Sequence, residues 1–198
     1  MKRLCLILAL SLAAAVPARA DLVSLGDLSR YLNGLETAQG RFSQINADGS
    51  VSMGDIYVHR PGRMRFEYDS DDLLVVAGGQ QVAIFDGRSN AFPEQYPLSK
   101  TPLNLILARR VDLAGSGMVI GHGSDGTNTR VLAQDPERPE NGTIELVFSD
   151  DPVALREWVI TDATGAQTTV VLGDLTHGAR LSSQLFNITA EIQTRNGN

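Results

Sequence analysis

The chain has 198 residues and a formal net charge of −6, with 42% hydrophobic and 20% charged residues. An acidic chain is poorly suited to bind nucleic acid or an anionic membrane surface, because both ligands select clusters of basic side chains. We therefore expect neither partner, and the length fits one domain with its own hydrophobic core.

The N-terminus has the pattern of a secretory signal peptide. Lys2 and Arg3 precede an apolar segment over 4–16, and Ala18-Arg19-Ala20 supplies a small-residue cleavage site. This predicts a signal peptide over 1–20, and its removal takes three cations and no acid, so that the mature chain is still more acidic.

We expect residues 21–198 to form a single domain in the periplasm. The apolar segment is too short for a membrane-spanning helix, which needs about 20 apolar residues. Cys5 is the only cysteine and lies within the predicted signal. The mature protein should therefore be soluble and stabilised by its core, without disulfides.

The mature chain begins with the pattern of an amphipathic helix. Ser24-Leu25-Gly26-Asp27 resembles a capping box, and leucines recur after it at helical spacing, which predicts a helix over 25–36. From Gly40 the apolar period changes to two, as in strands with one buried face. The alternating runs lie at 42–44, 56–58, 64–68 and 82–84. Turn sequences stand between such runs, at Asp48-Gly49, Pro61-Gly62, Gly78-Gly79 and Asp86-Gly87.

Residues 101–110 predict a second, short and apolar helix. Thr101 would cap it, Pro102 would take its first position, and Arg109 and Arg110 would lie near the negative end of its dipole. Further strands are predicted over 118–120, 129–133, 143–148, 155–161, 167–172 and 185–188. Many short strands with few helical segments indicate an α+β fold, in which one curved antiparallel sheet is covered on one face by helices.

The motifs that could carry chemistry are weak. Residues 121–126 match a dinucleotide-binding pattern, but a predicted strand follows where that motif needs a helix, so a hairpin turn is the better interpretation. The same segment narrowly misses the nucleophile elbow G-x-S-x-G, because His122 stands where the first glycine should be, so Ser124 is not a credible nucleophile. We therefore expect no enzyme and no cofactor.

A metal site is not expected either. His59, His122 and His177 have no second ligand at metal-binding spacing. The acidic residues around Asp69 and Asp72 lack the alternating ligands of a calcium loop, so they are interpreted as a solvated turn.

Three blocks in order resemble one family, the periplasmic outer-membrane lipoprotein carriers of the LolA family. They are the hairpin sequence over 54–68, the strand over 77–86 and the Thr-Pro-initiated helix over 101–108. The resemblance covers about residues 22–110 well and the remainder only in pattern. Ala83 departs from it, since it replaces the usual tryptophan, and Met64 stands where many relatives have an aromatic residue.

The resemblance implies an incomplete antiparallel β-barrel covered by a lid of helices, with a hydrophobic cavity for the acyl chains of a lipoprotein. The family's lid-latching arginine falls on Arg60, where it would donate hydrogen bonds to helix carbonyls. Arg60 shares the parity of Ile56 and Val58, but without the resemblance an arginine at this position would be expected on the surface. The candidate lining comprises Phe42, Ile56, Val58, Met64, Phe66, Tyr68, Val82 and Ile84 from the sheet, and Leu28, Leu32, Leu103, Ile106 and Leu107 from the lid. These residues equally fit an ordinary dry core.

The implied partners are acylated lipoproteins and an ATP-driven lipoprotein-releasing complex of the inner membrane, with the carrier itself a monomer. Some relatives have an extra C-terminal element where this chain has a polar tail after Ile188. The resemblance therefore does not decide whether a separate outer-membrane receptor takes part. An alternative is a lipoprotein- or lipid-sensing periplasmic module, which should have a second domain or an anchor. A periplasmic hydrolase is disfavoured because no local motif assembles a nucleophile, a base and an orienting group.

Overall fold

The computed structural model describes residues 22–70, 72–89 and 92–196, so the predicted signal peptide lies outside the described residues. The strands are β1 (Thr37–Ile45), β2 (Val51–His59), β3 (Met64–Tyr68), β4 (Leu73–Gly78), β5 (Gln81–Asp86), β6 (Glu94–Pro97), β7 (Val119–Ser124), β8 (Asn128–Gln134), β9 (Thr143–Asp150), β10 (Val153–Thr161), β11 (Gln167–Leu172) and β12 (Thr176–His177). The helices are α1 (Leu25–Gly34), α2 (Leu103–Leu107) and α3 (Ile188–Asn196), with 3-10 turns η1 (Leu98–Lys100), η2 (Pro139–Asn141) and η3 (Ser183–Phe186).

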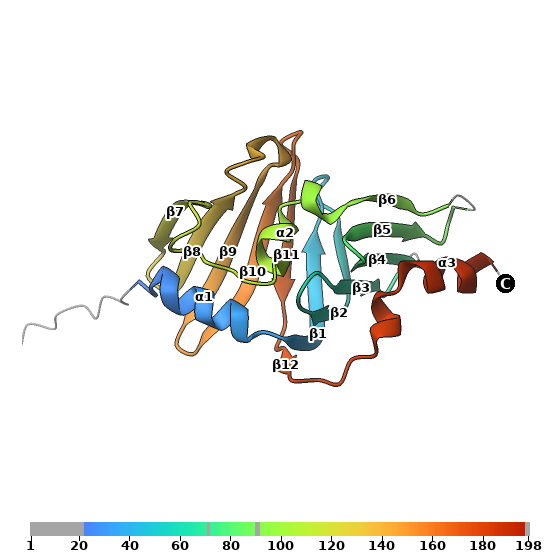
Figure 1. The fold of residues 1–198 in the computed structure, drawn as a ribbon, viewed down its shortest axis with the longest axis horizontal. Helices are drawn as coiled ribbons and strands as arrows, with labels where there is room; N and C mark the ends of the chain where they lie inside the picture. The colour runs from blue at the N-terminus through green and yellow to red at the C-terminus, as the bar shows by residue number, and fades with distance from the viewer. Residues whose placement is uncertain (1–21, 71, 90–91, 197–198) are drawn as a thin grey trace, which may run out of the picture.

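The strands form one antiparallel twelve-stranded sheet in the order β6-β5-β4-β3-β2-β1-β11-β10-β9-β8-β7, with β12 paired to β1. The sheet curls around α1 and α2, and the edge strands β6 and β7 lie far apart (Figure 1). This confirms the predicted α+β fold, an incomplete antiparallel barrel with a helical lid. No helix of the described part has both the length and the apolar character of a membrane span.

The turn predicted at Gly78-Gly79 lies one residue later, because Gly78 is the last residue of β4. Gly79 and Gln80 both have positive φ, +56° and +65°, which gives the two-residue turn that joins β4 to β5. The dinucleotide-like motif over 121–126 lies at the end of β7 and in its turn toward β8, which confirms the interpretation as a hairpin.

The inner face of the sheet and the lid share one apolar core. The largest fully buried side chains include Trp158 and Phe148 from the sheet and Leu28 and Leu32 from α1. Ser24 caps α1, since its Oγ accepts a hydrogen bond of 3.1 Å from the Asp27 amide. The helix ends at Gly34 rather than at Glu36, because Leu35 leaves the helical conformation.

The second lid helix is shorter than predicted, at Leu103–Leu107. Pro102 occupies its N-cap, and Thr101 does not cap it, because the Thr101 hydroxyl instead donates to the Leu98 carbonyl at 2.9 Å. Arg109 and Arg110 lie beyond the end of the helix and are exposed.

The outer face carries a third helix, where a strand over 185–188 was expected. That expectation is wrong: η3 and α3 occupy this region, and Ile188 and Ile192 lie four residues apart on the helix face that packs against the sheet. Their partners are Leu74, Val76, Ala83 and Phe85. Helices therefore lie on both faces of the sheet, rather than on one.

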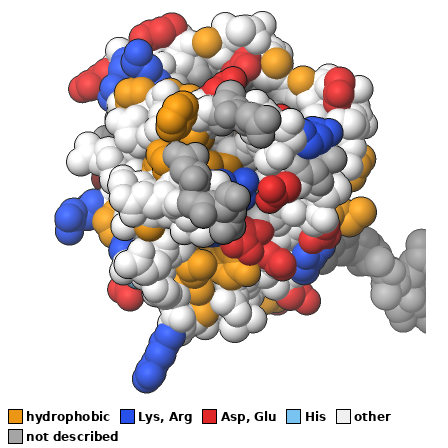
Figure 2. All heavy atoms as spheres, turned by 90° about the vertical axis from the view of Figure 1, so that its right-hand side faces the viewer, with side chains coloured by type: hydrophobic (Ala, Val, Ile, Leu, Met, Phe, Trp, Pro, Cys, Tyr) orange, Lys and Arg blue, Asp and Glu red, His pale blue; other side chains and the backbone are white. Residues whose placement is uncertain are grey.

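Charged groups fix α3 in this position. Arg65 donates to the Leu185 carbonyl and to Glu191, both at 3.1 Å, and the guanidinium of Arg195 lies 5.3 Å from the centre of the Phe85 ring. The end of the molecule that includes this region has basic and acidic side chains interspersed with small apolar areas (Figure 2).

Candidate functional site

The predicted cavity residues converge between the sheet and the lid. Those that lie buried in one apolar cluster are Leu28, Leu32, Phe42, Ile56, Val58, Met64, Phe66, Val82, Ile106 and Leu107. Tyr68 and Leu103 are partly buried against this cluster, whereas Ile84 is half-buried and belongs to neither apolar cluster of the described residues.

The interior is closed in this conformation. A cavity of about 20 Å³ remains between Leu32 and Leu35 on the lid side and Ile56, Val58 and Trp158 on the sheet side. Such a volume holds about one water molecule. The open hollow that the resemblance implies is therefore not formed in this state.

Trp158, Leu155 and Leu172 also line this interior, and sequence reasoning missed all three. The signal was present in part, because Trp158 lies in a predicted strand and a buried tryptophan contributes a large apolar surface. Alternation alone would not have paired it with Leu155, since a register shift between Leu155 and Glu157 turns both side chains inward.

Aromatic rings fill the sheet side of the interior. Phe42 meets Phe66 and Tyr68 edge to face, with ring centres 5.1 Å apart in each pair, and Phe66 meets Trp158 at 6.3 Å. The Tyr68 hydroxyl donates to the side-chain oxygen of Gln44 at 2.8 Å, and burial raises the pKa of Tyr68 to about 12. The hydroxyl is therefore neutral at physiological pH, and the ring offers an apolar surface.

Arg60 lies at the junction of β2 with both lid helices. Its guanidinium donates to the Leu32 carbonyl in the last turn of α1 and, at 2.7 Å, to the Ala108 carbonyl at the end of α2. A longer bond of 3.4 Å reaches Asn33 Oδ1. The residue is 9% exposed, so the side chain points inward, as Ile56 and Val58 do.

Helix ends attract this cation, because the last carbonyls of a helix lack partners within the helix and carry the negative end of its dipole. Arg60 forms no ion pair with any carboxylate of the described residues. Burial lowers the pKa of its guanidinium, which nevertheless stays charged at neutral pH. The main chain adds a bond between α2 and the turn that follows Arg60, since Gly62 N donates to the Leu107 carbonyl at 2.9 Å.

Two further polar residues join the lid segments to each other. The Asn33 amide donates to the Val111 carbonyl at 2.7 Å and accepts from the Val111 amide at 2.9 Å. Ser29 Oγ accepts from the Leu113 amide at 2.9 Å. Sequence reasoning missed both residues, although Ser29 is a polar residue within the apolar stripe of α1 and could have been identified as one.

The histidines do not meet. His122 contacts the Val23 carbonyl at 3.0 Å, His59 lies edge-on to Phe186, and His177 lies beside Tyr31. Across residues 22–70, 72–89 and 92–196, no group of three histidine, cysteine or acidic residues could hold a metal ion. In the acidic turn, Asp69 pairs with Arg41, Asp72 lies 3.4 Å from Arg195, and Asp71, the remaining acidic residue there, lies outside the described residues.

Comparisons with known proteins identify relatives along most of the chain. It is 24% identical over 189 residues to an outer-membrane lipoprotein carrier protein of Pseudomonas aeruginosa (strain UCBPP-PA14), covering 90% of this chain and 89% of that one. A second protein of the same name, from Coxiella burnetii (strain RSA 331 / Henzerling II), is 31% identical over 100 residues, 48% of this chain and 46% of its own length.

A solved structure supports the fold. A DUF1329 family protein from Desulfovibrio piger ATCC 29098 superposes with a TM-score of 0.50 at 11% identity, covering 84% of this chain and 95% of its own. The family model described as outer membrane lipoprotein carrier protein LolA matches residues 33–189, well beyond the part in which the sequence resemblance is clear. The chain therefore belongs to the LolA family of outer membrane lipoprotein carrier proteins.

Proposed function

We propose that this protein is a periplasmic lipoprotein carrier. It takes lipoproteins from an ATP-driven inner-membrane complex, shelters their acyl chains between the sheet and the lid, and delivers them to the outer membrane. Family membership and the names of the relatives support this function. The structural observation that carries it is the buried guanidinium of Arg60, which ties α1 and α2 together over an apolar interior.

Acyl chains would bind such an interior strongly. Burial contributes about 0.8 kcal/mol per methylene, so a chain of roughly sixteen carbons gains ~12 kcal/mol. Two or three such chains would exceed the practical limit of non-covalent affinity, near ~20 kcal/mol. A carrier needs a means to release its cargo, and a stable empty state provides one because it lowers the net affinity.

Arg60 can stabilise this empty state reversibly. Hydrogen bonds to a charged group contribute about 1.5–3 kcal/mol each, and the desolvation of the cation offsets part of that gain. When cargo displaces the helices, the guanidinium regains water and loses the Leu32 and Ala108 carbonyls. Opening is thus balanced between these bonds and the burial of the acyl chains.

A release assay tests the carrier function. Mature protein is incubated with spheroplasts that hold a labelled outer-membrane lipoprotein, and the soluble fraction is measured for label. We expect release that depends on the added protein, and an absence of release would reject the proposal.

The Arg60→Leu variant tests the latch. It should accept cargo and retain it more tightly, with delivery to outer membranes lost. Arg63→Leu is the matched control, because Arg63 lies on the same hairpin and its side chain donates to the His59 carbonyl, at 3.1 Å, rather than to the lid helices. Equal delivery by Arg60→Leu and wild type would show that Arg60 is not a latch.

A further inference from the structure

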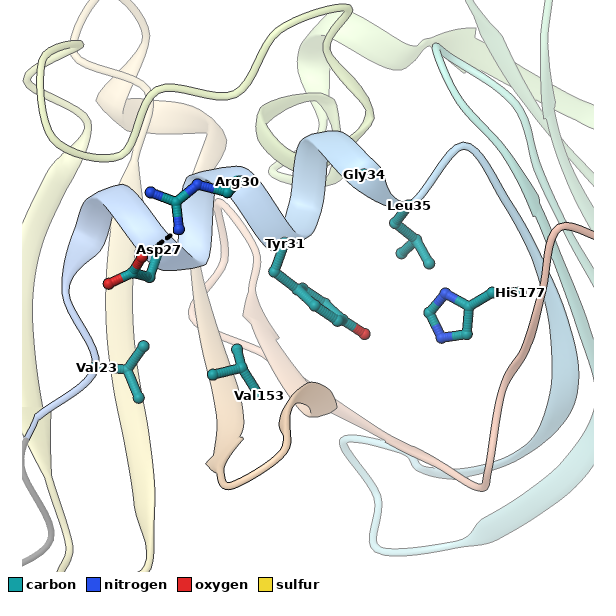
Figure 3. Close-up of a pocket in the computed structure, with 8 residues that line it drawn as sticks. All are labelled: Val23, Asp27, Arg30, Tyr31, Gly34, Leu35, Val153 and His177. Carbon is teal, nitrogen blue, oxygen red and sulfur yellow. Dashed lines mark hydrogen bonds and ion pairs between the residues drawn. The ribbon is translucent and has the colours of Figure 1, made fainter.

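A groove of about 500 Å³ runs outside the closed lid, between α1 and the sheet. Tyr31 from α1, Val153 at the start of β10 and His177 of β12 face it from three sides (Figure 3). The Tyr31 ring points into the groove and meets Phe148 and His177 edge-on, with ring centres 6.0 and 6.4 Å apart.

Only a layer of side chains separates this groove from the interior. Leu35 lines both the groove and the interior cavity. A smaller pocket of about 150 Å³ shares Tyr31 and His177 with the groove, and shares Leu155 and Leu175 with the interior. The groove therefore lies along the line where α1 would separate from the sheet.

We propose that this groove receives one acyl chain of the cargo before the lid opens. The inference rests on the proposed carrier function and names the path by which the cargo enters. An acyl chain suits the groove because Val23, Tyr31, Leu35 and Val153 give it apolar walls. Its charged residues, Asp27 and Arg30, form an ion pair with each other and are well exposed.

The closed interior cannot admit a chain, since it offers about 20 Å³ against about 500 Å³ in the groove. A chain in the groove replaces the contacts of Tyr31 and Leu35 with apolar contacts of its own. Movement of α1 away from the sheet then separates Leu32 from Arg60 and gives the chain access to the interior.

A substitution at Gly34 can fill the groove and leave the interior unchanged. It lies in α1 at the groove wall, and a Cβ added there would meet no atom within 4 Å. The Gly34→Phe variant should therefore place a ring in the groove without disturbing the core. Gly26→Phe is the control, because Gly26 is an exposed residue of the same helix outside the groove, and its nearest contact would be ordinary, at 3.8 Å from Ser24 Oγ.

Stopped-flow fluorescence with dansyl-labelled undecanoic acid and the mature protein measures both rates of binding. We expect Gly34→Phe to slow association and dissociation together, by about tenfold, with the dissociation constant unchanged. A tenfold change corresponds to ~1.4 kcal/mol, which is the burial of about two methylene groups. Gly26→Phe should keep the wild-type rates.

Val153→Gln, which makes the opposite wall polar, should slow both rates as well and serves if Gly34→Phe fails to fold by circular dichroism. Equal rates in the groove variants and the control would overturn the groove proposal and leave the carrier function intact. A changed dissociation constant without slower exchange would also overturn it, because a path alters rates alone. If the probe binds neither wild type nor Arg60→Leu, the carrier function itself is rejected.

Discussion

Replacement of Asn33 by alanine should loosen the lid and leave the sheet unchanged. The Asn33 amide joins α1 to the chain after α2 by bonds of 2.7 and 2.9 Å to the main chain of Val111, and it receives a 3.4 Å bond from Arg60. Alanine has the higher helix propensity, so α1 itself should persist. The loss of stability should therefore be confined to the contact between α1 and the chain around Val111.

The structure sets the size of the effect. A neutral hydrogen bond contributes about 0.5–1.5 kcal/mol, so the two bonds to Val111 together contribute ~2 kcal/mol. Val111 is 1% exposed, so its main-chain groups cannot readily exchange the lost partner for water in the closed state. An effect of ~2 kcal/mol raises the population of the locally open lid by about 30-fold.

Native-state hydrogen exchange measures this change residue by residue. The amides of Val111 and Leu113 should exchange about 30-fold faster in Asn33→Ala, while the amide of Trp158 in the sheet keeps its protection. Arg30→Ala is the control, since its exposed ion pair with Asp27 should contribute little. Unchanged exchange at Val111, or an equal acceleration at Trp158, would refute the role of Asn33 as a joint.

The segment on the outer face provides two further predictions. In Gly78→Ala the added Cβ would lie 2.1 Å from the Phe186 carbonyl oxygen, so η3 must shift. We expect urea denaturation to show that the free energy of unfolding falls by about 1–3 kcal/mol. Gly123→Ala is the control and should show no such loss, because its Cβ would meet open space. Burial lowers the pKa of His59, so the folded state binds the proton less readily than the unfolded chain, and stability should fall as the pH drops below the ordinary value near 6.5. A His59→Gln variant should show a shallower decline in that pH range, and an identical pH profile would contradict the assignment.

Alternation along the strands predicted most of the sheet, because one face of each strand packs against the core and the other meets solvent. Residues 167–172 are a strand with the predicted bounds, and 129–133 and 143–148 lie within β8 and β9. β4 was not predicted, and the physical reason is its position. Its sequence from Leu73 to Ala77 is continuously apolar because the core covers one face and α3 covers part of the other.

The candidate site was predictable in part. Parity put Ile56, Val58 and Arg60 on one side of a strand, but only the family resemblance suggested that a guanidinium lies inside. Asn33 and Ser29 escaped prediction because their partners, the main chains of Val111 and Leu113, lie in a segment with no regular structure. Local patterns of sequence do not specify which irregular backbone a side chain will meet.

The same apolar pattern fits a solid core and an interior that opens, so the way the lid is attached decides between them. Bonds from Arg60, Asn33 and Ser29 to main-chain groups hold α1 and the chain around α2 together. Water can replace such bonds at a net loss of about 0.5–1.5 kcal/mol for a neutral pair. The apolar contacts of Leu28, Leu32 and Ile106 with the sheet can be exchanged for contacts with acyl chains of similar free energy per unit area. If the protein is the carrier proposed above, opening toward cargo would exchange apolar contacts for apolar contacts and hydrogen bonds for hydrogen bonds, and a few hydrogen bonds would suffice to determine which state is populated.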